Sequence, residues 1–169
     1  MKKALMVLSV ALLGQITLAQ AATDWAPYVR SMMSGCSFPN PAYEGLPPLY
    51  NKSVVSKKVK VDSEDYDIVD YEGDTITTFN LKNATAFGYP LLKVEQLQGY
   101  EWGHLKLYFK DTEFTSLRSS FKLPLPEDPE YSPLFVKKND ASGYDVEDIG
   151  YISLNFDIED KSITCYGGL

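Results

Sequence analysis

The stretch IGYISLNFDIEDKSITC, residues 149–165, carries the clearest structural pattern in this chain. Apolar and polar side chains alternate along its first half, which is the period of a half-buried β-strand. The polar run EDKS, residues 159–162, then predicts a turn into a second strand that ends at Cys165. In the predicted register Phe156 lies opposite Cys165, so the cysteine side chain faces the core.

The same period recurs upstream and predicts a mainly β chain. Residues 75–82 (TITTFNLK) and 104–110 (HLKLYFK) alternate regularly, and residues 53–61 (SVVSKKVKV) alternate loosely. Gly88 and Pro90 indicate an edge or bulged strand between them. From these runs we expect an antiparallel sheet of about six to eight strands, arranged as a sandwich or a partly closed barrel.

A short helix is predicted before the first of these strands. In TDWAPYVRSMMSGC, residues 23–36, Pro27 falls in the first turn and Gly35 stands where a left-handed helix stop is expected. The apolar side chains recur at helical spacing on one face: Trp25, Tyr28, Val29 and Met32. The fold class expected is therefore α+β and mainly β, with this N-terminal helix packed on the sheet.

The first 21 residues have the pattern of a secretory signal peptide. Two lysines precede an apolar stretch over residues 4–13, and Ala19-Gln20-Ala21 is a small-x-small cleavage site. The apolar run is too short to cross a bilayer, which takes about 20 residues. Cleavage after Ala21 would leave residues 22–169 as a single globular domain in the periplasm or outside the cell, with no membrane insertion.

The charge balance of this mature chain is acidic. The signal contains two of the 16 basic residues and none of the 23 acidic ones, so 14 basic side chains face 23 acidic ones and the net charge is −9. Such a chain repels nucleic acid and attracts cationic partners. Acidity also keeps secreted proteins soluble, which is the simpler explanation of the same count.

The two cysteines are predicted to form a disulfide. Cys36 and Cys165 are separated by 129 positions, and paired cysteines are the common state in an oxidising compartment. A bridge that closes so long a loop stabilises a fold by roughly 5 kcal/mol in the chain-entropy description.

The remaining residues offer few ways to build a catalytic or metal site. His104 is the single histidine, no G-x-S-x-G motif surrounds a serine, and zinc sites normally need two or more His or Cys ligands. His104 begins an alternating strand and is expected on its solvent face. The acidic stretch of residues 62–74 fails the EF-hand template in every register. We therefore predict no catalytic residue, no metal and no cofactor.

Two segments are candidates for contact with a partner. The first, DSEDYDIVDYEGD at residues 62–74, combines carboxylates that steer a basic partner with tyrosines that are common at interfaces. A solvated loop protected by its charge explains the same composition. The second, GYEWG at residues 99–103, presents two aromatic side chains between glycines, which suit a sugar, a partner protein or the end of the sheet. The candidate residues are Asp62, Glu64, Asp65, Tyr66, Asp67, Asp70, Tyr71, Glu72, Asp74, Tyr100 and Trp102.

These observations favour a non-enzymatic binding protein of the bacterial envelope that recognises another protein, in the manner of an inhibitor or an immunity protein. The first alternative is a β-domain that binds a small apolar or sugar ligand in a cavity. The second is a carboxylate-dependent hydrolase, which would need two acids converging in one pocket.

Overall fold

The computed structural model describes residues 21–62, 73–126, 133–147 and 150–168. Its strands are β1 (Thr23–Asp24), β2 (Val54–Asp62), β3 (Asp74–Ala86), β4 (Tyr89–Gln98), β5 (Trp102–Phe109), β6 (Phe135–Asp140), β7 (Gly143–Glu147), β8 (Tyr151–Asp157) and β9 (Ser162–Gly168). Its helical segments are α1 (Ala26–Val29), η1 (Arg30–Met33), α2 (Pro48–Asn51) and η2 (Glu113–Ser120).

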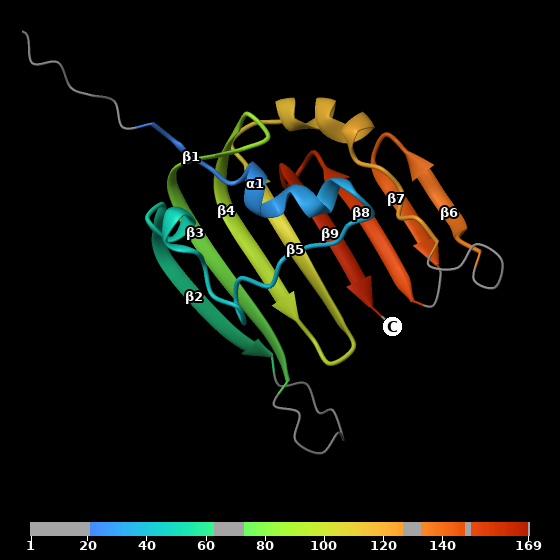
Figure 1. Cartoon of the computed structure of the whole chain (residues 1–169), viewed down its shortest axis with the longest axis horizontal. Coiled ribbons are helices and arrows are strands. Elements are labelled where there is room, and N and C mark those ends of the chain that lie inside the picture. The colour runs from blue at the N-terminus through green and yellow to red at the C-terminus, as the bar shows by residue number, and fades with distance from the viewer. Residues whose placement is uncertain (1–20, 63–72, 127–132, 148–149, 169) are drawn as a thin grey trace, which may run out of the picture.

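The nine strands form one sheet, and its order is β1-β3-β4-β5-β9-β8-β7-β6 with β2 also paired to β3 (Figure 1). β2 and β1 share one edge of β3, where β2 covers Asp74 to Leu81 and β1 covers Ala84 and Thr85. Every pairing is antiparallel except that of β1 with β3. The last strand of the chain, β9, lies inside the sheet between β5 and β8.

The prediction of a mainly β, largely antiparallel chain is confirmed, and the finer expectations need correction. The structure has nine strands where six to eight were expected, because β1 contains two residues and shows no alternation. Within the described residues the strands form a single sheet that does not close on itself, and the residues around Gly88 form the turn between β3 and β4. Pro90 lies in β4, which has a partner on each side and is not an edge strand, but the bulged alternative is confirmed, because the pairing of β4 with β5 shifts between Leu91 and Lys93.

Alternation along β5 sorts its side chains onto the two faces of the sheet. Leu105, Leu107 and Phe109 are buried on the face that α1 and η1 cross (Figure 1). Cross-strand pairing continues this core into β9, where Leu105 lies opposite Cys165. The alternate residues of β5, including His104, project from the opposite face of the sheet.

The N-terminal segment is more irregular than the single helix predicted. Trp25, Val29 and Met32 are fully buried, but α1 and η1 are two consecutive four-residue turns, the second of 3-10 type. The backbone N–H of Lys122 donates to the carbonyl of Met33 at 2.9 Å, and Lys122 in turn accepts from the N–H of Gly35 at 3.1 Å. These bonds use the groups that would extend a helix, so the segment ends against the chain that follows η2.

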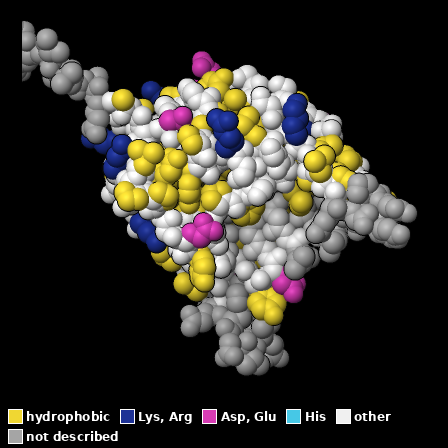
Figure 2. All heavy atoms as spheres, in the orientation of Figure 1, with side chains coloured by type: hydrophobic (Ala, Val, Ile, Leu, Met, Phe, Trp, Pro, Cys, Tyr) yellow, Lys and Arg dark blue, Asp and Glu magenta, His cyan; other side chains and the backbone are white. Residues whose placement is uncertain are grey.

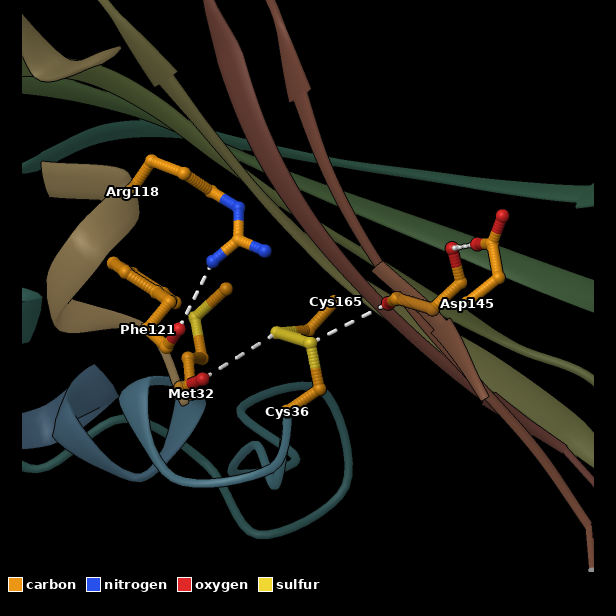
Figure 3. The surroundings of a disulfide bond; sticks show 7 residues. Met32, Cys36, Arg118, Phe121, Asp145 and Cys165 are labelled. Carbon is orange, nitrogen blue, oxygen red and sulfur yellow. Dashed lines mark hydrogen bonds between the residues drawn. A yellow bond between two sulfur atoms is a disulfide. The ribbon is translucent and has the colours of Figure 1, made fainter. Parts of the chain in front are cut away.

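The disulfide predicted from the sequence is present between Cys36 and Cys165, whose Cα atoms are 5.1 Å apart (Figure 3). Both residues are buried in the core. The Cys36 sulfur lies 3.3 Å from the Ser153 carbonyl oxygen, and the Cys165 sulfur lies 3.8 Å from that of Met32. Because disulfide sulfurs carry no proton, these are packing contacts that enclose the bridge between η1 and the sheet.

The predicted face of Cys165 is correct and the predicted register is wrong by one pair. Cys165 lies opposite Leu154, and Phe156 lies opposite Ile163. The Asp157 carboxylate accepts a hydrogen bond from the N–H of Asp160 at 2.9 Å, which begins the turn earlier than the run EDKS suggests. Shifting one whole pair keeps every side chain on its face.

A single arginine connects η2 to the β6–β7 hairpin. The guanidinium of Arg118 donates to the carbonyl oxygens of Phe121 (3.0 Å), Asp140 (2.8 Å) and Gly143 (3.0 Å), and to the side chain of Asn139 (2.7 Å). Figure 3 shows the bond to Phe121 near the disulfide. The carbonyl oxygens that accept from this fork lie just after η2, at Phe121, and at the hairpin turn, where Asp140 ends β6 and Gly143 begins β7.

Candidate functional site

An open groove of about 550 Å³ lies at the end of the sheet that contains the turn between β4 and β5. We call it the end groove. The 37–42 segment forms one wall, the β4–β5 turn forms the second, and the adjoining ends of β8 and β9 complete it. Its lining residues are Phe38, Asn40, Gln96, Leu97, Gln98, Gly99, Tyr100, Glu101, Trp102, Gly103, Gly150, Tyr151, Ile152, Gly167 and Gly168.

Glycines leave part of this groove lined by bare backbone. Gly103 of β5 and Gly167 of β9 are directly paired across the two strands, so neither contributes a side chain between them. A Cβ atom at Gly103 would lie 2.8 Å from the Leu97 carbonyl oxygen, whereas one at Gly167 would meet nothing within 4 Å. Gly103 is therefore required by the strand geometry, and Gly167 faces open space.

The two aromatic residues predicted as a contact site both line the end groove. The Trp102 ring lies against Tyr166, with ring centroids 5.6 Å apart, and Tyr166 contacts Tyr151 at 5.8 Å. Trp102 also covers Gly99, since a Cβ there would be 2.5 Å from its indole nitrogen. Trp102 is thus partly packed into the end of the sheet, while Tyr100 is 59% exposed at the turn.

Amide side chains that the sequence analysis did not identify hold the opposite wall. Gln96 is 2% exposed, and its side-chain oxygen accepts from the N–H of Ala42 at 2.8 Å. Asn40 donates to Gln98 at 3.4 Å and accepts from the N–H of Tyr43 at 3.0 Å. These bonds fix the 40–44 turn over β4. The sequence pattern could have identified these glutamines, because Gln96 and Gln98 occupy core-facing positions of β4, where apolar residues are expected.

A second, smaller depression of about 340 Å³ adjoins the end groove. The two share Gln98 and Gly99. Its lining includes Tyr43 and Val59, whose side chains are 82% and 57% exposed. Large apolar side chains exposed around a concave surface are typical of sites of contact with another molecule.

The acidic segment predicted to contact a partner lies mostly outside the described residues. Its described ends are the last residue of β2, Asp62, and the first of β3, Asp74, which are paired with each other. Asp74 is buried, and the adjacent Thr75 is paired with Gln98 of the groove wall. Both ends of the acidic segment therefore lie at the same end of the sheet as the end groove (Figure 1). The candidates outside the described residues are Glu64, Asp65, Tyr66, Asp67, Asp70, Tyr71 and Glu72.

His104 lies on the opposite face of the sheet, away from the groove lining. Its side chain is 17% exposed, so it is more enclosed than the solvent-facing position predicted, and its Nε2 lies 3.7 Å from the Glu95 carboxylate. Glu95 also contacts the Lys93 ammonium at 3.6 Å and accepts from the Tyr108 hydroxyl at 3.2 Å. His104, Lys93 and Tyr108 together hold the pKa of Glu95 at about 2, against the opposing effect of burial.

The chemistry of the groove lining suits binding. Among the described residues that line it, Glu101 is the one carboxylate, and histidine, lysine and cysteine are absent. A glycosidase pair would need a second acid beside it. The described residues also contain no cluster of three or more His, Cys, Asp or Glu side chains that could hold a metal ion.

Comparison with protein-family models, with curated proteins and with solved structures finds no match to this chain. In the part of the chain that the structure describes, no helix is both long and apolar enough to span a bilayer. The predicted signal peptide lies almost entirely outside that part.

Proposed function

We propose that this protein is an exported, periplasmic binding protein without enzymatic activity, and that it recognises another protein in the bacterial envelope as an inhibitor or immunity protein does. The observation that supports the proposal most directly is the grouping of exposed Tyr43, Tyr100 and Val59 at one end of the sheet. The acidic segment leaves and re-enters the sheet at that same end.

The two features have complementary roles in such an interface. Exposed aromatic and aliphatic side chains provide the area that becomes buried, and tyrosine combines a large apolar ring with a hydrogen-bonding hydroxyl. Carboxylates at the rim accelerate encounter with a basic partner and contribute less to the final affinity. We therefore expect a partner whose contact surface is basic around an apolar centre.

A pull-down from periplasmic extract tests this function. The wild-type mature protein should retain a partner that elutes with added salt, since screening weakens contacts between exposed charges. Tyr100→Ala should weaken retention by removing buried contact area. Neutralising the acids between residues 62 and 74 should slow association and reduce the salt dependence.

The matched control neutralises Glu113 and Glu159, two exposed acids at the opposite end of the sheet, and should leave binding unchanged. The partner identified by mass spectrometry is then purified and titrated against each variant. Failure to recover any partner whose retention depends on salt and on Tyr100 would contradict the proposal.

A small sugar or apolar ligand is the second candidate, and the glycine-lined floor of the end groove favours it. The groove volume of about 550 Å³ lies within the usual range for ligand sites. Aromatic rings and amide side chains around glycine backbone suit a ring-shaped ligand with hydroxyl groups. Native mass spectrometry of freshly purified protein distinguishes the candidates, because a co-purified small molecule supports this one.

A further inference from the structure

A third pocket, at the opposite edge of the sheet from β6, is lined by two basic side chains. It has a volume of about 610 Å³ and lies where the described chain begins. We call it the basic pocket. Its lining residues are Ala21, Thr23, Lys52, Ser53, Val55, Lys82 and Asn83. Two lysines line it and no carboxylate does, although the whole chain contains more acidic than basic residues.

The two lysine-bearing segments are held together by hydrogen bonds of the backbone and core. The N–H of Lys82 donates to the carbonyl of Ser53 at 2.9 Å. The Ser53 hydroxyl donates to the Tyr50 carbonyl at 2.7 Å and accepts from the buried Trp25 indole at 3.0 Å. The positions of Lys52 and Lys82 around the pocket are therefore set by the fold.

An irregularity in β3 turns the pocket-lining residues outward. The pairing of β3 with β4 shifts between Asn80 and Ala84, and Asn83 within the shift has a φ of 51°. A left-handed conformation is uncommon for a residue other than glycine and is most often found in turns, bulges and functional sites. The Asn83 amide donates to the Ala21 carbonyl at 3.3 Å, which places it beside the start of β1.

Neither lysine is neutralised by the described part of the protein. Lys93, Lys106, Lys137 and Lys138 each contact a carboxylate, whereas the ammonium groups of Lys52 and Lys82 contact no carboxylate among the described residues. Figure 2 shows Lys and Arg side chains gathered along this margin of the molecule, next to the point where the described chain begins. Two uncompensated ammonium groups that line one pocket favour an anionic ligand.

We propose that the basic pocket binds a small oxyanion of the phosphate class through Lys52 and Lys82, with hydroxyl and amide donors from Thr23 and Asn83. The proposal goes beyond the protein-recognition function and is independent of the end groove. Signal cleavage after Ala21, which belongs to the proposed function, would remove Ala21 together with the carbonyl that accepts from Asn83, and would leave the α-amino group of Ala22 next to Thr23 as a third cation. Lysine ammonium groups are common phosphate-binding groups, and side-chain hydroxyl and amide groups add hydrogen-bond donors.

Titration of the mature protein with inorganic phosphate in low-salt buffer, followed by amide NMR shifts of residues 82–84, tests the pocket. We expect saturable binding, and Lys52→Gln and Lys82→Gln should each weaken it by at least about fivefold, the loss of one charge-assisted hydrogen bond. Lys110→Gln removes an exposed lysine outside the pocket and should leave the affinity unchanged. Both pocket lysines are exposed, so thermal melts of all three variants should match the wild type.

Vesicles identify the source of the phosphate group. Phosphatidylglycerol vesicles, compared with phosphatidylcholine vesicles, report binding to a lipid headgroup, and either source supports the pocket if Lys52→Gln and Lys82→Gln weaken binding while Lys110→Gln does not. The proposal is overturned if neither phosphate nor anionic vesicles bind saturably, or if Lys110→Gln has the same effect as the pocket variants. The pull-down depends on Tyr100 and the acidic segment and not on the pocket lysines. The outcome of the phosphate titration therefore does not decide the protein-recognition proposal.

Discussion

Among the described carboxylates, Glu95 is the one whose pKa lies furthest from its ordinary value. It lies on the face of the sheet opposite the core, with His104 and Lys93 within 4 Å and the hydroxyl of Tyr108 as a hydrogen-bond donor. All of these neighbours come from β4 and β5, so the strand pairing itself assembles the cluster. The ionised form of Glu95 is therefore part of the folded structure.

This cluster predicts an acid-dependent loss of stability. Because folding lowers the pKa of Glu95 from 4.5 to about 2, its contribution is fully present above pH 4.5 and is lost as the pH falls toward 2. We expect about 1–2 kcal/mol, less than the full linkage value because the group is partly exposed and screened. Urea denaturation at pH 6 and pH 3 measures it.

Glu95→Gln serves as the reference for that measurement, since other acids also titrate in this range. The difference in unfolding free energy between pH 6 and pH 3 should be smaller in the variant than in the wild type. An identical pH dependence in both proteins would show that Glu95 contributes nothing through its charge.

At the scale of elements, Gly103 of β5 and Gly167 of β9 are directly paired but should respond differently to substitution. Gly167→Val should leave the unfolding free energy within about 0.5 kcal/mol of the wild type, because its side chain enters open space in a strand that tolerates β-branched residues. Gly103→Val should lose about 1–3 kcal/mol, because its Cβ meets the Leu97 carbonyl. Chemical denaturation of both variants checks the contrast.

The same two variants also distinguish an effect on the end groove from an effect on the stability of the fold. A folded Gly167→Val protein that no longer binds its ligand or partner would place the contact in the end groove. If Gly167→Val were as destabilised as Gly103→Val, the described openness of the groove at this position would be wrong.

Which elements could be predicted depended on whether their sequence carried a local pattern. The strands β3, β5, β8 and β9 alternate regularly and were located from that period, as was the inward face of Cys165. The register of the last hairpin was not, because the carboxylate of Asp157 sets the turn and composition does not reveal which side chain does so. β1 depends entirely on a parallel contact with β3 that is distant in sequence.

The candidate site was predicted in part for the same reason. GYEWG is a local feature, so Tyr100 and Trp102 were found, whereas Asn40 joins the groove through a long-range bond to Gln98. Gly167 gains its role from a partner strand about 60 residues earlier in the chain. The partner-binding role of the acidic segment stays a prediction.

For the whole molecule, the disulfide joins the segment after η1 to a central strand and closes a loop of 129 residues. Replacing both Cys36 and Cys165 by serine should lower the unfolding free energy by up to about 5 kcal/mol, through the freedom returned to the unfolded chain. Because ordinary domains have only 5–15 kcal/mol of stability, a large fall in melting temperature is expected. Thermal melts of the wild type with and without reductant provide the comparison, and equal melting temperatures would contradict a stabilising role.

The position of β9 has a further consequence for the order in which the chain can fold. Because β9 follows β8 in the chain and fills the gap between β5 and β8, β2 to β5 can pair before β9 is synthesised, while the inner edge of β5 waits for its neighbour. During that interval β5 and β8 both present unpaired backbone, the state most prone to association with other chains. A chain that stops short of Ser162 would therefore be split into two incomplete sheets, a far more severe defect than the loss of a strand from the margin.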